Sequence, residues 1–289
     1  MLFFFKKKRK VLFPTFLLLF AMISIQSGAF LAKKLFPIIG TFGVTALRLF
    51  LATITLLAMF KPWQKRINTK SIVYLIIYGI SLGSMNSLFY LSLERIPLGI
   101  AVALEFTGPL SIAIFSSRKL IDFFWISIII LGLIFLLPLS KETNSLNLSG
   151  ILYALAAGFF WGMYIIFGRK SSESHGYSTT VSIGSLISTA IFFPIGVFKV
   201  GIQHLFDFSI FPIAIAVSFL STTFPYTVEM FVLTKMSSKT FGKLMSLEPV
   251  IGAFIGITFL NEKLTGAQWL SLLCIIIASV GSSIEKMKQ

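Results

Sequence analysis

The chain of 289 residues is 56% hydrophobic and only 12% charged, and its mean hydropathy is +0.92. This composition excludes an ordinary soluble domain, in which about 25% of residues are charged. The formal net charge of +15 does not indicate a nucleic-acid partner, since the basic residues are scattered between apolar runs. With a single cysteine and two histidines in expected loops, we predict no disulfide, metal or cofactor.

The fold is predicted to be all-α, with ten helices that cross a bilayer. A hydrocarbon core about 30 Å thick needs roughly 20 apolar residues per helix, and such runs recur along the chain. Strands are not expected, because every backbone polar group must be satisfied within lipid and no barrel-like alternation appears. The predicted spans are approximately 12–32, 38–60, 71–92, 97–116, 121–139, 148–168, 178–198, 209–232, 240–260 and 265–284.

The first apolar run resembles a secretory signal peptide. "KKKRK" precedes Val11–Ile25, and Ser27-Gly28-Ala29 resembles a cleavage site. Because many further spans follow and the run fits the repeat described below, we predict that it is retained as the first helix.

The basic residues predict the orientation. Connectors on the N-terminal side of the membrane hold 17 of the 25 lysines and arginines, and those on the opposite side hold 6. Cytoplasmic connectors carry the excess of such residues, so both termini are predicted to be cytoplasmic. No connector is long enough for a separate soluble domain.

The second half of the chain repeats the first. A shift of 140 residues aligns Pro109 with Pro249, and a shift of 144 aligns Trp125 with Trp269. Each repeat would contain five spans, an odd number, so the second would enter the membrane from the opposite face. We therefore predict two inverted five-helix repeats, at residues 1–140 and 141–289. Because prolines free backbone carbonyls within helices, Pro109 and Pro249 are predicted helix breaks beside a central site.

Two ionisable residues lie deep within predicted spans, where charges are costly and usually face a cavity or each other. Glu105 lies about 12 Å, and Arg48 about 15 Å, from the outer ends of their helices. The similar depths permit an ion pair between them.

Two further acids lie in the second half. Glu248 lies at a depth comparable to that of Glu105, measured from the inner end of its span. Glu229 lies nearer the inner end of its own span, where it can extend toward water or pair with Lys239 or Lys243.

Membrane-embedded acids can bind a substrate ammonium group, or carry protons, because burial disfavours their charged form. Polar and aromatic residues of other spans can complete a cavity around them, although most single aromatics only pack or lie at the interface. The candidates are Gln26, Asn86, Tyr90, Trp161, Tyr164 and Tyr226.

Two segments resemble the EamA-type branch of the drug/metabolite transporter superfamily, and within it the threonine/homoserine exporters. They are "MNSLFYLSLERIPLGIAVALEFTGPL" (85–110) and "PYTVEMFVLTKMSSKTFGKLMSLEPVIGAFIGITFLNEKL" (225–264). "GVTALRLFLA" (43–52) also fits the family's second span, with Arg48 at the usual arginine. The resemblance covers nearly the whole chain and implies a ten-helix bundle that exports small polar metabolites in exchange for protons. The residues it places in family motifs are Glu105, Pro109, Tyr226, Glu229, Glu248 and Pro249.

The first span departs from the family pattern. Where the superfamily usually has Trp-Gly, this chain has Ile25-Gln26, and Trp161-Gly162 stands in the sixth predicted span instead. Because Gln26 can line the cavity, this departure leaves the identity of the substrate open.

We therefore predict a secondary active transporter of the bacterial inner membrane that exports an amino acid such as threonine or homoserine in exchange for protons. No "GxxxxGK[ST]" loop for ATP, nucleophile–base pair of an enzyme or repeated channel filter is visible. Uptake or exchange of another metabolite, such as a nucleotide-derived compound or an organic cation, is the alternative. Whether the protein forms a homodimer is left open.

Overall fold

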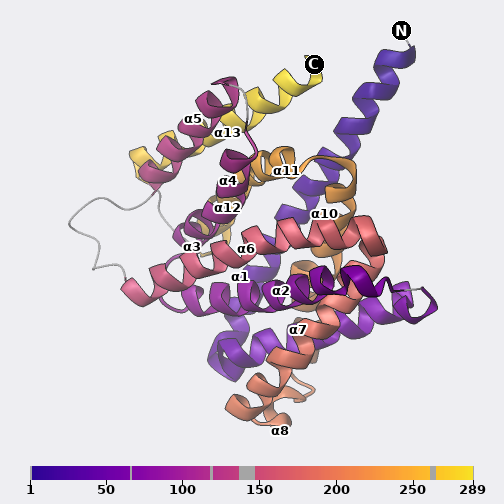
Figure 1. Cartoon of the computed structure of the whole chain (residues 1–289). Helices are drawn as coiled ribbons and strands as arrows, with labels where there is room; N and C mark the ends of the chain where they lie inside the picture. Colours follow the sequence, from indigo (N-terminus) through magenta and orange to yellow (C-terminus); the bar gives the residue numbers. More distant parts are fainter. Residues whose placement is uncertain (1, 66, 118–119, 137–146, 261–264, 289) are drawn as a thin grey trace.

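The computed structural model describes residues 2–65, 67–117, 120–136, 147–260 and 265–288 (Figure 1). Every regular element in these ranges is a helix, which confirms the all-α prediction. The predicted division between the repeats, at residues 140 and 141, lies outside the described residues.

The first two predicted spans form one long element with a break. Helix α1 runs from Leu2 to Phe60 and continues through Pro37, where the sequence predicted a connector. The break occurs at Gly40, whose φ of 63° and ψ of 172° lie outside the helical region. Glycine adopts this conformation readily because it has no Cβ. The predicted boundary was therefore wrong by several residues, and a single glycine replaces the connector.

The remaining elements of the first half follow the predicted order. They are the short 3₁₀ helices η1 (Pro62–Gln64) and η2 (Thr69–Ser71), then α2 (Ile72–Leu93), α3 (Leu98–Glu105), α4 (Thr107–Phe115) and α5 (Leu120–Leu136).

The second half differs from the prediction mainly at its first connector. "GRKSSESHGYS" was predicted to be a loop, but α6 (Leu148–His175) continues through it, and only Gly176 separates α6 from α7 (Tyr177–Val200). His175, predicted to lie in a loop, is buried at the end of α6, with its Nε2 atom 3.2 Å from the Asn68 carbonyl oxygen. The elements that follow are α8 (Ile202–Leu205), α9 (Phe211–Ser218), the π-helical turn η3 (Phe219–Thr223), α10 (Phe224–Lys235), α11 (Ser238–Leu244), the 3₁₀ turn η4 (Met245–Leu247), α12 (Glu248–Leu260) and α13 (Gly266–Lys288).

Seven helical stretches within the described residues are long and apolar enough to cross a membrane. The first, Phe13–Gln64, contains 52 residues and is more than twice the length that one crossing requires. Two shorter apolar helices, Leu120–Phe135 and Trp269–Ala278, accompany the seven. The chain is therefore a helical membrane protein with many crossings.

Helices from the two halves pack against each other throughout the bundle. In Figure 1, α2 lies along α6, α1 along α7, and α5 along α13. Glycines allow the closest approach, between α4 and α6, where a Cβ atom added to Gly108 would lie 1.9 Å from the Gly158 carbonyl oxygen. Small residues permit such backbone contacts between membrane helices. This contact holds the junction of α3 and α4 against the middle of α6.

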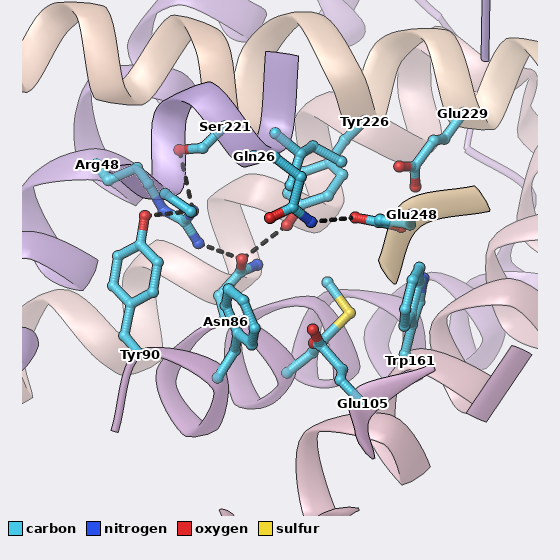
Figure 2. Close-up of a pocket in the computed structure, with 14 residues that line it drawn as sticks. Gln26, Arg48, Asn86, Tyr90, Glu105, Trp161, Ser221, Tyr226, Glu229 and Glu248 are labelled. Atoms are coloured by element: carbon cyan, nitrogen blue, oxygen red, sulfur yellow. Dashed lines mark hydrogen bonds between the residues drawn. The ribbon is translucent and has the colours of Figure 1, made fainter. Parts of the chain in front are cut away.

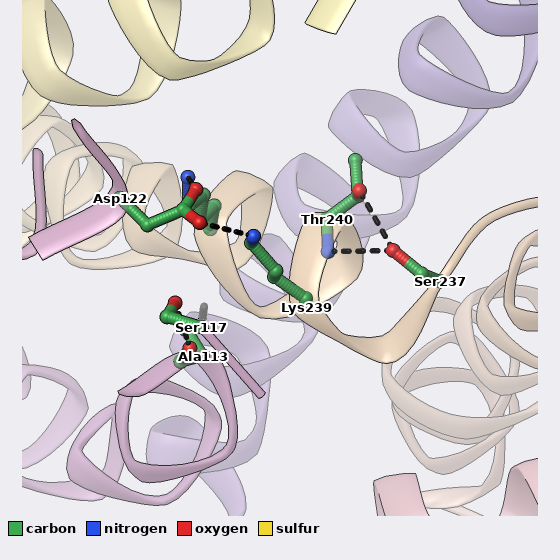
Figure 3. Close-up of polar contacts among 7 residues, drawn as sticks. Ala113, Ser117, Asp122, Ser237, Lys239 and Thr240 are labelled. Atoms are coloured by element: carbon green, nitrogen blue, oxygen red, sulfur yellow. Dashed lines mark hydrogen bonds and ion pairs between the residues drawn. The ribbon is translucent and has the colours of Figure 1, made fainter. Parts of the chain in front are cut away.

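A buried ion cluster joins α5 to α11 (Figure 3). The Asp122 carboxylate accepts a hydrogen bond from Lys239 Nζ and another, of 2.7 Å, from Lys243 Nζ. The sequence pointed to these two lysines as partners of Glu229, and that prediction was wrong. Asp122 lies near the start of α5 and is 5% exposed. No pattern in the sequence indicated that it would bind these lysines.

Replacing Asp122 with asparagine should destabilise the protein by about 3 kcal/mol, because it removes the carboxylate that binds two partly buried lysines. Thermal unfolding of the purified protein in detergent measures the effect. Asp207→Asn is the matched control, since Asp207 is exposed in the segment before α9 and accepts its hydrogen bond from Ser209 N–H. Equal unfolding temperatures for both variants would show that the cluster contributes little.

Candidate functional site

A pocket lies among the helices of both halves (Figure 2). Nine of the ten residues predicted to line a substrate or proton site line this pocket, and the tenth, Tyr164, lies behind it with its hydroxyl bonded to Glu229. The nine are Gln26, Arg48, Asn86, Tyr90, Glu105, Trp161, Tyr226, Glu229 and Glu248. The structure adds Ile25, Ala29, Met85, Phe89 and Ser221. The juxtaposition is a structural finding, whereas the roles of these residues stay predictions.

Arg48 is the one basic residue among the lining residues and is 3% exposed. Its Nη1 atom donates to the Tyr90 hydroxyl at 2.9 Å and to Ser221 Oγ at 3.0 Å. Its Nη2 atom donates to Asn86 Oδ1. The guanidinium also stacks over the Tyr90 ring, 4.4 Å from its centroid. Nε has no hydrogen-bond partner.

The permitted ion pair between Arg48 and Glu105 does not form among the described residues, because neutral groups occupy the guanidinium. Asn86 carries this neutral network into the second half, since its Oδ1 atom also accepts a 2.7 Å hydrogen bond from the Tyr226 hydroxyl. These hydrogen bonds thus fix Arg48 in place, and no acid among the described residues contacts its guanidinium directly.

Two of the three acids each accept one hydrogen bond. Gln26 Nε2 donates to Glu248 Oε1 at 3.1 Å, and the Tyr164 hydroxyl donates to Glu229 Oε2 at 2.9 Å. The other carboxylate oxygen of each acid is buried without a partner. Glu229 is 1% exposed, so the expectation that it extends to water was wrong. The function of Glu229, which the resemblance to the family placed in a motif, stays a prediction.

Glu105 differs from the other two acids. Its side chain is 8% exposed and accepts no hydrogen bond from any described residue. It lies at the last position of α3, where the chain passes through Phe106 into α4. Pro109 follows four residues later and has no N–H to donate to the Glu105 carbonyl, so the helix is interrupted at the acid itself.

The second half has a corresponding interruption. Between α11 and α12 the chain forms the tight turn η4, and Glu248 begins α12 immediately before Pro249. Pro249 lacks an N–H for the carbonyl of Met245, and the Glu248 N–H donates to that carbonyl instead. Glu105 and Glu248 therefore both lie at helix interruptions beside a proline, although they lie at different distances from it.

Sequence reasoning missed Ser221. This residue lies in η3, the π-helical turn of "FLSTT" that joins α9 to α10, and its hydroxyl faces Arg48. π-helical turns within α-helices are frequent at functional sites. The cluster of three small hydroxyl residues in an apolar span was the available signal.

Among the described residues, no three His, Cys, Asp or Glu side chains converge to hold a metal ion. The pocket instead presents one cation and three carboxyl groups in an otherwise neutral, aromatic wall. Intramembrane ionisable groups that face a shared cavity mark substrate and ion pathways. The fold and the pocket thus define a membrane transport protein.

Comparisons with known proteins agree that the chain is a transport protein. The model of the EamA-like transporter family matches residues 148–284. The threonine/homoserine exporter RhtA of Salmonella typhimurium (strain SL1344) is 51% identical over 96% of this chain and 94% of its own. The exporter of the same name from Escherichia coli (strain K12) is 50% identical over 98% and 95%. This chain belongs to the EamA-like transporter family, whose members are transporters rather than enzymes.

A solved crystal structure supports the fold independently. It covers 94% of this chain and 96% of its own with a TM-score of 0.67, at 15% sequence identity. Similarity at this level of identity shows the fold alone.

Proposed function

We propose that this protein is a proton-coupled secondary transporter that exports threonine, homoserine or a closely similar amino acid across the bacterial inner membrane. The observation that carries the proposal is the pocket, in which a buried arginine and three buried acids from both halves of the chain face one cavity. The relatives named as threonine/homoserine exporters support the choice of substrate.

The charges of the pocket suit an amino acid. A zwitterion carries a carboxylate and an ammonium group, and the pocket offers a partner for each. Arg48 Nε has no hydrogen-bond partner, and arginine is well suited to bind carboxylates. Glu105 has a carboxyl group free of hydrogen bonds from described residues, and this group can receive the ammonium. The two remaining acids can then carry protons.

The proposed topology has ten crossings. Counting the 52-residue stretch as two crossings and adding the two shorter apolar helices to the other six stretches gives ten. Figure 1 supports placement of both termini on one side of the membrane, since α1 begins and α13 ends toward the same end of the bundle. The excess of basic residues in the connectors on that side supports the cytoplasmic assignment.

The contacts between helices support two inverted repeats. If the halves are related by symmetry, a contact between α2 and α6 requires a matching contact between α9–α10 and the first part of α1. Helix α1 does contact α9, η3 and α10. Likewise, contacts of α3 and α4 with α6 are matched by a contact of α12 with α1. Inverted repeats supply two gates around a midplane site, as alternating access requires.

Metabolite profiling of cytosol and medium tests substrate and direction together. Cells that produce the protein should hold less threonine and homoserine inside, and release more, than cells without it. Purified protein in liposomes should then transport labelled threonine with saturable kinetics. Unchanged amino-acid levels together with inactive liposomes would overturn the proposal.

Transport should stop when the proton gradient is removed. We expect a protonophore to reduce threonine accumulation in liposomes by at least about tenfold, because the buried acids must load and release protons in each cycle. Collapsing only the membrane potential with potassium and valinomycin separates the two components of the driving force. Accumulation that survives the protonophore would show that protons do not drive transport.

One observation favours a second candidate. Three acids outnumber the single arginine in the pocket, which gives the cavity an excess of negative charge whenever the acids are ionised. Such a cavity also suits an organic cation. Small quaternary or primary amines without a carboxylate distinguish the two candidates. They should compete with threonine at a site for organic cations, and compete poorly at a zwitterion site that depends on Arg48.

A further inference from the structure

Gln26 links the two halves of the chain across the pocket. It is 1% exposed, and its Nε2 atom donates to Glu248 Oε1. Its Oε1 atom has no hydrogen-bond partner, and neither does Glu248 Oε2. Two adjacent side chains of the pocket lining thus each hold a buried acceptor without a partner. Buried polar atoms without partners are costly, so a ligand that donates to them gains affinity.

Gln26 and Glu248 lie beside the residues proposed to bind the substrate carboxylate. In Figure 2 the Gln26 amide lies between the group around Arg48 and the side chain of Glu248, with its nitrogen directed at Glu248. Gly252, one turn after Glu248 on α12, lies beside Gln26 Oε1 and has no side chain to fill the space there. A Cβ atom added to Gly252 would meet Gln26 Oε1 at 3.4 Å, closer than any other atom.

We propose that Gln26 and Glu248 form the subsite that recognises the side-chain hydroxyl of the substrate. This inference rests on the proposed function, in which Arg48 and Glu105 bind the carboxylate and ammonium groups. Threonine and homoserine share one further polar group, a hydroxyl, which donates one hydrogen bond. The unpaired oxygen of Gln26 or Glu248 accepts it, and Gln26 Nε2 keeps the Glu248 carboxylate oriented.

A subsite of this kind selects against apolar analogues. Valine has the shape of threonine with a methyl group in place of the hydroxyl, and 2-aminobutyrate is homoserine without its oxygen. Either analogue leaves the acceptors buried and unpaired. Sites built to hydrogen-bond a hydroxyl reject analogues that lack it far more strongly than apolar pockets reject an extra methyl group.

The test measures transport of threonine and valine, and of homoserine and 2-aminobutyrate, by purified protein in liposomes. The wild type should prefer the hydroxylated member of each pair by at least about tenfold. Gln26→Met keeps the length of the side chain but removes its amide. This change should reduce the preference by about tenfold, mainly through loss of transport of the hydroxylated substrates.

Two further variants make the test decisive. Gly252→Ala leaves Gln26 in place but puts a methyl group beside Oε1, and should also reduce the preference. Ser27→Ala is the matched control, because the Ser27 hydroxyl bonds the Ile23 carbonyl oxygen on the same helix and does not line the pocket. Its preference should equal that of the wild type.

The outcomes separate this inference from the proposed function. Wild-type protein that transports neither threonine nor homoserine would overturn both. Wild-type transport without discrimination against valine would overturn the hydroxyl subsite alone. So would an equal fall in transport of all four substrates in Gln26→Met, because Gln26 would then only orient Glu248.

Discussion

Arg48→Met is expected to reduce threonine transport at low substrate concentration by at least about 100-fold. The guanidinium can make two charge-assisted hydrogen bonds to a substrate carboxylate, and each is worth about 1.5–3 kcal/mol. Methionine supplies neither these bonds nor a positive charge. Initial rates of labelled threonine uptake into liposomes measure the loss.

The variant should still fold, because most partners of Arg48 keep another hydrogen bond. Asn86 Oδ1 continues to accept from Tyr226, and Ser221 Oγ continues to donate to the Val217 carbonyl oxygen. The Tyr90 hydroxyl alone loses its one described partner. A monodisperse elution profile in detergent checks the fold before transport is measured.

Arg48→Lys is the matched comparison. Lysine keeps the charge but not the planar fork that binds a carboxylate through two parallel hydrogen bonds. Its transport should therefore lie between that of the wild type and that of Arg48→Met. If the correctly folded methionine variant transported threonine at the wild-type rate, Arg48 would be a structural residue that holds α1 against α2 and η3.

Glu105→Gln is expected to fold normally and to lose most transport. Because no described residue donates a hydrogen bond to the Glu105 carboxyl, the change leaves no protein group without its partner. Glutamine has nearly the same size but cannot neutralise an ammonium group or release a proton. Loss of one charge-assisted contact of this kind corresponds to at least about tenfold.

One control and two comparison variants accompany this prediction. Glu94→Gln changes an exposed acid paired with Arg95 in the short segment between α2 and α3, and should leave transport unchanged. Glu229→Gln and Glu248→Gln change acids that already accept a hydrogen bond from Tyr164 or Gln26. Full transport by a well-inserted Glu105→Gln protein would contradict the role of Glu105 as the ammonium partner.

The sequence alone determined the class of the protein and nine of the 14 residues that line its pocket. Apolar length is a local property, so the membrane helices could be predicted without knowledge of their contacts. Charged residues inside such helices are rare and must face a cavity, which pointed directly to Arg48, Glu105 and Glu248. Paired prolines pointed to the two helix interruptions in the same way.

Only the tertiary structure decided which polar groups meet. Arg48 could have paired with Glu105, yet it binds Tyr90, Asn86 and Ser221. Glu229 could have bound lysines, which instead bind Asp122. The reason is physical: helices that are apolar on every face carry no periodic signal for their rotation about their own axes. Close contacts such as Gly108 against Gly158 set that rotation, and they become visible only when the helices are packed.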